Sequence, residues 1–127
     1  MFFITSIKGQ DTINYVTGPH GGLLKSVENY KVEVINTYGC ISAYLFDSAL
    51  KLIPNKYLSG SILFFFDNDV SLNKYLIPEG TDGFIVDVSN ANYYYYVIHF
   101  KLNEKRIITR FNNSSSIAEI EQKNMKK

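Results

Sequence analysis

The chain of 127 residues has the length of a single domain, and its hydrophobic fraction of 46% is typical of a folded protein. Ten tyrosines and nine phenylalanines favour β-structure, because aromatic side chains pack well on a pleated sheet. A net charge of +1 argues against a dedicated nucleic-acid-binding protein, and a single cysteine excludes an intramolecular disulfide. No apolar run is long enough to span a membrane, and the N-terminal residues do not resemble a signal peptide, so we expect a cytoplasmic protein.

The first half of the chain is predicted to contain strands, one loop and one helix. Alternating or apolar runs predict strands at residues 2–7, 12–16 and 30–36. Glycine and proline at 17–22 predict a loop between the second and the third of these strands. From 41 to 53 the apolar residues recur at helical spacing and Pro54 closes the segment, which predicts a helix.

The second half is predicted to contain more strands and a second short helix. The strands are expected at residues 61–66, 84–88, 92–102 and 106–111. The segment 71–77, which ends before Pro78, is predicted to form two helical turns. The last two strands should form a hairpin. A turn of Glu104 and Lys105 gives the better core, whereas turn chemistry favours a longer loop, so the register stays open.

These elements together predict an α+β fold, with an antiparallel sheet of about six strands and one or two helices packed on it. One globular domain is expected to span residues 1–112. Residues 113–127 are predicted to be a polar linker followed by a short charged helix or tail.

Tyrosines at positions 93–96 are the most unusual feature of the sequence. Alternation along a strand places two of these rings in the core and leaves Tyr93 and Tyr95 on the opposite face. A helix covering that face would make the pair structural. An exposed pair would serve as a protein-binding hot spot or as a platform on which bases stack.

An acidic stretch precedes these tyrosines. Between residues 67 and 87 there are five acidic side chains and one basic one, whereas residues 99–127 contain seven bases and three acids. An acidic and aromatic surface is suited to a basic protein partner, which it would attract over a distance. The residues predicted to bind this partner are Asp67, Asp69, Glu79, Asp82, Tyr93 and Tyr95.

No motif in the sequence identifies a catalytic or metal-binding site. The acid pair Asp67 and Asp69 follows an apolar strand and could hold a divalent cation, but these residue types are also the usual turn formers. The loop around His20 could bind an anion through its backbone N–H groups, yet it lacks the P-loop lysine and is predicted to be a flexible connection. Cys40 has no local signature of a nucleophile and is expected to be a buried, unreactive thiol. We therefore predict no enzyme activity, metal or cofactor.

The Tyr-rich strand, the acidic stretch and the Asn/Lys/Ile-rich composition resemble those of the small immunity proteins that bacteria encode beside secreted or contact-delivered toxins. The resemblance implies a cytoplasmic α+β domain that occludes one cognate toxin, such as a nuclease. Two other classes stay open. A single-stranded nucleic-acid-binding protein would use Tyr93, Tyr95 and the basic C-terminal third, for which Lys101, Arg106 and Arg110 supply charge. A small enzyme would use His20, Cys40 or the acid pair.

Overall fold

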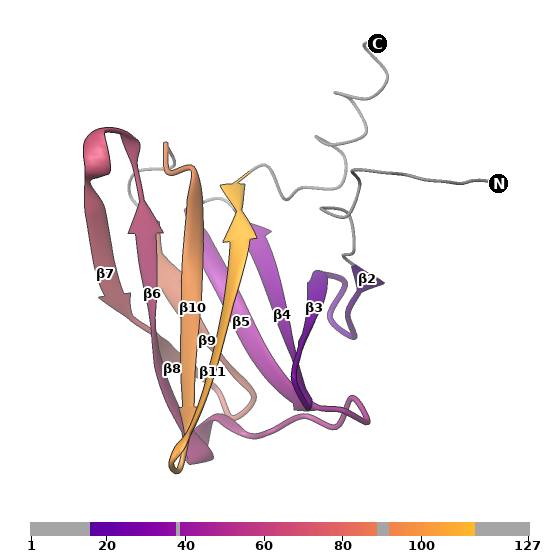
Figure 1. The fold of residues 1–127 in the computed structure, drawn as a ribbon. Helices are drawn as coiled ribbons and strands as arrows, with labels where there is room; N and C mark the ends of the chain where they lie inside the picture. Colours follow the sequence, from indigo (N-terminus) through magenta and orange to yellow (C-terminus); the bar gives the residue numbers. More distant parts are fainter. Residues whose placement is uncertain (1–15, 38, 89–91, 114–127) are drawn as a thin grey trace, which may run out of the picture.

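The computed structural model describes residues 16–37, 39–88 and 92–113 (Figure 1). Within these residues the chain forms β-strands and two single-turn 3-10 helices. The strands are Val16–Thr17 (β2), Leu23–Val27 (β3), Tyr30–Thr37 (β4), Cys40–Asp47 (β5), Leu58–Phe65 (β6), Ser71–Tyr75 (β7), Ile77–Glu79 (β8), Gly83–Asp87 (β9), Tyr95–Leu102 (β10) and Lys105–Asn112 (β11). The 3-10 helices are Asn55–Tyr57 (η2) and Asp67–Asp69 (η3).

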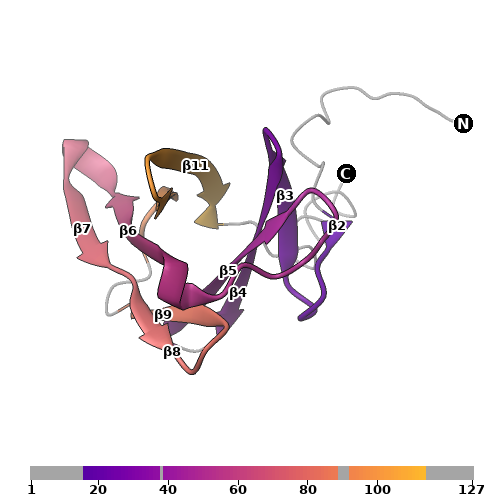
Figure 2. The same ribbon diagram turned by 90° about the horizontal axis from the view of Figure 1, so that it is seen from below.

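The strands build two antiparallel sheets that enclose a common interior (Figure 2). The smaller sheet has the order β11-β10-β6-β7, and the larger has the order β2-β3-β4-β5-β9-β8. The chain passes from one sheet to the other between β7 and β8. Leu76 is buried at this crossing, and its backbone N–H donates to the carbonyl oxygen of Gly60 at 3.0 Å. One continuous segment therefore closes one side of the two-sheet structure.

The core lies between the two sheets and follows from the alternation of side chains along each strand. Val32 and Val34 point inward from β4, while Lys31 and Glu33 lie on its other face, as the sequence pattern predicts. The largest fully buried apolar side chains come from both sheets: Tyr96, Phe64, Phe84, Phe100, Phe111, Ile41, Leu45, Ile62, Ile98 and Ile107.

The predicted α+β class is wrong, because both predicted helices are strands. Residues 41–53 begin as β5, where Ile41, Ala43 and Leu45 alternate into the core. After Asp47 the chain turns through Leu50, whose φ is 64°, and returns so that the N–H of Ile53 bonds to the carbonyl oxygen of Leu45 at 2.9 Å. The apolar residues of 41–53 therefore recur at helical spacing because a strand is followed by a tight turn, after which the chain runs back along it.

The second predicted helix, at 71–77, is the edge strand β7 and the start of β8. Leu72 pairs with Phe64 of β6, and Pro78 lies in β8, which is also an edge strand where its missing N–H is tolerated. The strands predicted at 30–36, 61–66, 84–88 and 106–111 are confirmed as β4, β6, β9 and β11. The strand predicted at 2–7 and the tail beyond Asn113 lie outside the described residues. Of the strand predicted at 12–16 only Val16 is described, and it begins β2.

The β10–β11 hairpin uses a two-residue turn of Asn103 and Glu104, one position earlier than the turn that gave the better predicted core. Leu102 pairs with Lys105, and Phe100 pairs with Ile107. Asn103 has a φ of 54°, a left-handed conformation that asparagine tolerates better than most residues. The longer loop that turn chemistry favoured is therefore not formed. The observed register and the register predicted from the core place the same residues on the core face, because they differ by two positions.

This turn leads to a first prediction. Asn103→Val should lower the free energy of unfolding by about 1–2 kcal/mol, because a β-branched residue is strained at positive φ. Asn103→Gly should leave stability unchanged or raise it slightly. Urea denaturation compares the two variants with Glu104→Val as a neighbouring control. Equal stability of Asn103→Val and the parent would show that this backbone conformation is not required.

Candidate functional site

The four acidic residues predicted to bind a partner lie at opposite ends of the molecule. Asp67 and Asp69 are exposed in η3, where β6 leads into β7. Glu79 lies in β8 and Asp82 in the turn that follows it, also exposed. Because β7 and β8 run in succession from the upper to the lower end of the molecule (Figure 1), the two pairs are separated by the length of both strands. The predicted acidic surface does not assemble.

Tyr93, predicted to face away from the core, is buried, with 5% of its surface exposed. Its ring packs against the rings of Phe64, Phe66 and Tyr96, with ring centroids 5.1–6.5 Å apart. Burial raises the pKa of the Tyr93 hydroxyl. The prediction is wrong because β10 begins only at Tyr95, so strand alternation does not extend back to residue 93.

Tyr94 is the exposed tyrosine of this group, at 59%. Its hydroxyl donates a hydrogen bond to the carboxylate of Asp67, and this bond, with the negative charge beside it, raises the pKa of Tyr94. The contact ties the start of β10 to η3. Asp67 is therefore engaged within the protein.

Tyr95 faces away from the core, as alternation predicts, and is half-buried by two neighbours. The ring of Phe65 stacks beside it, with centroids 4.6 Å apart and an interplanar angle of 18°. The guanidinium carbon of Arg110 lies 3.8 Å from the Tyr95 ring centroid. Such cation–π packing fixes the position of the arginine, which is a good donor to anionic groups.

The surface of the smaller sheet that points away from the core, here called the outer face, is the best candidate for a binding site. In the views of Figures 1 and 2 no described element covers it. Its cations are Lys101 of β10 and Arg106 and Arg110 of β11. Among the described strand residues that point outward, none is acidic, although Glu104 and Asp67 lie at the two ends of the sheet. The pairing registers give the outward-facing residues: Ser59, Ser61, Leu63, Phe65, Ser71, Asn73, Tyr75, Tyr95, Val97, His99, Lys101, Arg106, Ile108, Arg110 and Asn112.

A hollow of about 210 Å³ lies at one end of the outer face. Its described lining includes two of the three cations, two aromatic rings and two serine hydroxyl groups, and no carboxylate. Such a combination can hold an anionic group next to a planar one. The residues that line the hollow are Ser59, Gly60, Ser61, Tyr75, His99, Lys101 and Arg106.

The opposite surface, on the larger sheet, contains a buried carboxylate that the sequence did not single out. Glu33 points away from the core, yet it has no exposed surface because the loop from Gly18 to Gly22 folds over it. Its Oε2 accepts hydrogen bonds from the backbone N–H groups of His20 and Gly22, both at 2.8 Å, and its Oε1 contacts Nδ1 of His20 at 2.8 Å. The His20 ring stacks on Tyr44, with centroids 3.9 Å apart.

This arrangement changes the interpretation of the loop at 17–22. The loop binds an anion through its backbone N–H groups, but the anion is the protein's own Glu33 carboxylate. The flexible connection predicted from its glycines is instead held in place by three contacts to one side chain. We interpret it as a structural clamp, because the His20 ring contacts the protein's own Glu33 carboxylate and stacks on Tyr44.

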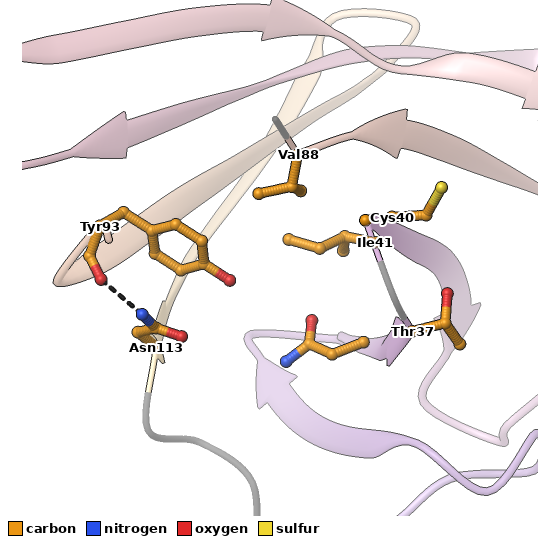
Figure 3. A pocket seen from close by; sticks show the side chains of 8 residues that line it. Thr37, Cys40, Ile41, Val88, Tyr93 and Asn113 are labelled. Atoms are coloured by element: carbon orange, nitrogen blue, oxygen red, sulfur yellow. Dashed lines mark hydrogen bonds between the residues drawn. The ribbon is translucent and has the colours of Figure 1, made fainter. Parts of the chain in front are cut away.

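Another pocket, of about 510 Å³, is lined by Asn36, Thr37, Gly39, Cys40, Ile41, Val88, Tyr93 and Asn113 (Figure 3). Ile41 and Val88 lie between the Tyr93 ring and Cys40, whose sulfur points away from that ring. Neither histidine lines this pocket, because His20 contacts Glu33 and His99 lies in the hollow. The described residues that line this pocket therefore include no histidine that could act as the base of a cysteine nucleophile.

Cys40 is only partly buried, so the prediction of a buried thiol is wrong in that respect. Partial burial, followed by the contact between Sγ and Oδ1 of Asp87 at 3.6 Å, raises the pKa of the Cys40 thiol. A raised pKa reduces the thiolate fraction at neutral pH, and the thiolate is the reactive form. The expected low reactivity stays a prediction.

A second prediction concerns this thiol. At pH 7.5 a maleimide reagent should label Cys40 more slowly in the native protein than in urea, and Asp87→Asn should speed the native reaction by removing the charge that disfavours the thiolate. The rate in the native protein should rise with pH until the thiol has ionised. Native labelling as fast as in urea would contradict the prediction.

Among the described residues no group of three or more His, Cys, Asp or Glu side chains is placed to hold a metal ion, and Asp67 and Asp69 gain no third ligand there. The described part of the chain also has no helix that is both long and apolar enough to cross a membrane. No protein-family model matches the sequence, and no curated protein and no solved structure is significantly similar to it.

Proposed function

We propose that the protein is a non-enzymatic, cytoplasmic binding domain that binds single-stranded nucleic acid through the outer face. One observation carries the proposal. Lys101, Arg106 and Arg110 share an uncovered sheet face with aromatic rings, and none of the described residues that point outward from the same strands is acidic. The net charge of +1 therefore conceals a local excess of positive charge.

The shape of the outer face favours a single strand over a duplex. Four strands span about 14 Å across the sheet, which suits one extended chain of nucleotides. Exposed rings on a sheet stack on unpaired bases, whereas the bases of a duplex are already stacked and paired. Tyr75, which is 77% exposed, and His99 present such rings. Arg110, held on the Tyr95 ring, offers a planar cation nearby.

A third prediction tests the proposal by salt dependence. With three cations on the face, the slope of log K against log salt should be about −2, so affinity should fall roughly twenty-fold between 50 and 200 mM salt. The measurement is fluorescence anisotropy of labelled dT10 and rU10. Arg106→Gln and Arg110→Gln should each reduce the slope by about 0.7.

The matched control is Lys51→Gln, which removes an exposed cation outside the outer face. It should bind the oligonucleotides as the parent does. If neither oligonucleotide binds, or if all three variants behave alike, the proposal fails.

A protein partner is the second candidate, favoured by apolar side chains on the same face. Leu63 and Val97 are paired neighbours, and Ile108, opposite His99, is 51% exposed. An apolar centre flanked by cations is also typical of a protein interface. The toxin-neutralising role suggested by the resemblance would then use this face, and its toxin would present an acidic surface rather than a basic one.

The protein of the adjacent gene provides the test of this second candidate. The parent and Val16→Glu, which changes an exposed residue of the larger sheet, should retain that protein on co-purification, whereas Ile108→Glu should lose it. Equal retention by all three would reject the outer face as the protein-binding surface.

A further inference from the structure

Two rows of side chains run across the sheet and form the hollow. In the first row, Tyr75 of β7 and His99 of β10 lie on either side of Ser61 of β6. In the second row, Ser59 of β6 pairs with Lys101, and Lys101 pairs with Arg106 of β11. The rows are two residues apart along the strands, which corresponds to about 7 Å. The hollow therefore has a ring-lined part and a cationic part.

The small size of the residues in β6 keeps the hollow open. Ser59 and Ser61 are the outward-facing side chains of β6 in the hollow, whereas Gly60, whose backbone also lines it, faces the core side of the strand. A β-carbon at Gly60 would come within 2.6 Å of the carbonyl oxygen of His99 and 2.8 Å of Leu76 Cδ1, so the strands pack tightly behind the hollow. The sheet thus forms a firm floor, and larger side chains surround it.

We infer that the hollow holds one nucleotide of a single strand, with its base between Tyr75 and His99 and its phosphate against Lys101 and Arg106. The inference rests on the proposed function and assigns the part of the outer face that recognises the ligand. Ser59 and Ser61 place hydroxyl groups where they can bond to the sugar or to the phosphate.

The spacing across the sheet agrees with a base held between two rings. Tyr75 and His99 are separated by two strand spacings, about 10 Å between their backbones. A flat base in contact with a ring on each side needs about 7 to 8 Å between the rings. Both side chains can lean toward Ser61 to reach this distance, since Tyr75 is largely exposed and His99 is partly exposed.

The aromatic rings of Tyr75 and His99 favour a nucleotide over an acidic peptide as the ligand of the hollow. A carboxylate side chain would use Lys101 and Arg106 but would leave the Tyr75 and His99 rings without a partner. A nucleotide uses both parts of the hollow at once, because its base stacks while its phosphate binds the cations. A nucleotide therefore accounts for more of the lining.

The test follows amide NMR shifts of the full chain during titration with AMP, UMP, inorganic phosphate, uridine and deca-glutamate. AMP and UMP should shift the amides of Ser61, His99 and Lys101, whereas phosphate alone should shift only those near Lys101 and Arg106. In the anisotropy assay Tyr75→Ala should weaken dT10 binding at least about fivefold. The matched control Tyr57→Ala, also an exposed tyrosine, should leave binding unchanged.

Each other result overturns the inference in a distinct way. If dT10 binds with the expected salt slope but AMP and UMP leave the hollow unmoved and Tyr75→Ala binds normally, the hollow is not a nucleotide site, although the proposed function stands. If neither oligonucleotide nor mononucleotide binds, both fail. If inorganic phosphate alone causes the same amide shifts as AMP and UMP, the base does not bind in the hollow. If deca-glutamate acts as strongly as AMP, the hollow is a general anion site and a protein partner is favoured.

Discussion

Glu33→Ala is expected to lower the free energy of unfolding by about 3 kcal/mol. The substitution leaves the N–H groups of His20 and Gly22 under the loop without their acceptor, and each such group costs about 1–3 kcal/mol. It also removes the partner of the His20 ring nitrogen and empties the space that the fully buried side chain fills. Water entering beneath the opened loop should recover part of this loss.

Urea denaturation gives the stability, and hydrogen exchange at the His20 and Gly22 amides reports the loop directly. Both amides should exchange far faster in Glu33→Ala than in the parent. The control is Glu28→Gln, which removes an exposed carboxylate paired with Lys105 and should change stability by less than about 1 kcal/mol. If Glu33→Ala proves as stable as this control, the clamp does not stabilise the fold. Oligonucleotide binding by the outer face should persist in folded Glu33→Ala, because the clamp belongs to the other sheet.

The position of Glu33 could be predicted from the sequence, but its burial could not. Alternation with Val32 and Val34 correctly places Glu33 on the face opposite the core. A charged residue on that face is expected to be exposed. Its burial depends on a loop that begins fifteen positions earlier, and nothing in the pattern of residues 30–36 signals that the loop returns over it.

The strands of the second half could largely be predicted because their alternation is regular, whereas β5 with the turn after it, and β7, could not be distinguished from helices. Leu45, Leu52 and Ile53 lie at helical spacing, but they meet because the chain reverses near Leu50 and the N–H of Ile53 bonds back to Leu45. A short apolar segment can fit the helical period of 3.6 residues and the strand period of 2 residues equally well. Whether it forms a strand then depends on whether another strand is available to pair with it. For residues 71–75 the partner is β6.

The candidate site, too, could be predicted only in part, because the sequence does not show which strands are neighbours. Alternation along β10 correctly placed Tyr95 and Lys101 on the face opposite the core, and the observed pairing with β11 adds Arg106 and Arg110 to that face. It could not show that β6 and β7 extend this face with Ser61 and Tyr75, because strand order was unknown. The acidic residues appeared to form one stretch in sequence, yet extended strands carry them to opposite ends of the molecule.

Gly60→Ala is expected to lower the free energy of unfolding by about 2–3 kcal/mol, the upper part of the range of about 1–3 kcal/mol for inserting a methyl group into a packed region. The added β-carbon would meet the carbonyl oxygen of His99 at 2.6 Å and Leu76 Cδ1 at 2.8 Å. The leucine methyl can move, but the carbonyl belongs to the β10 backbone that pairs with β6 in the middle of the smaller sheet. Relief therefore requires the two strands to separate locally, which weakens their hydrogen bonds.

Urea denaturation again measures the effect, with Gly39→Ala as the matched control. Gly39 has a φ of 75° and nothing within 4 Å of an added β-carbon, so this control isolates backbone strain of about 1 kcal/mol. A loss no greater at Gly60 than at Gly39 would show that β6 and β10 can accommodate the methyl group. In that case the backbones of β6 and β10 beneath the hollow can move apart more easily than the close contacts at Gly60 indicate. If Gly60→Ala is destabilised as expected but still folded, its weakened strand pairing should also reduce dT10 binding, because the same two strands hold Ser61, His99 and Lys101 in position.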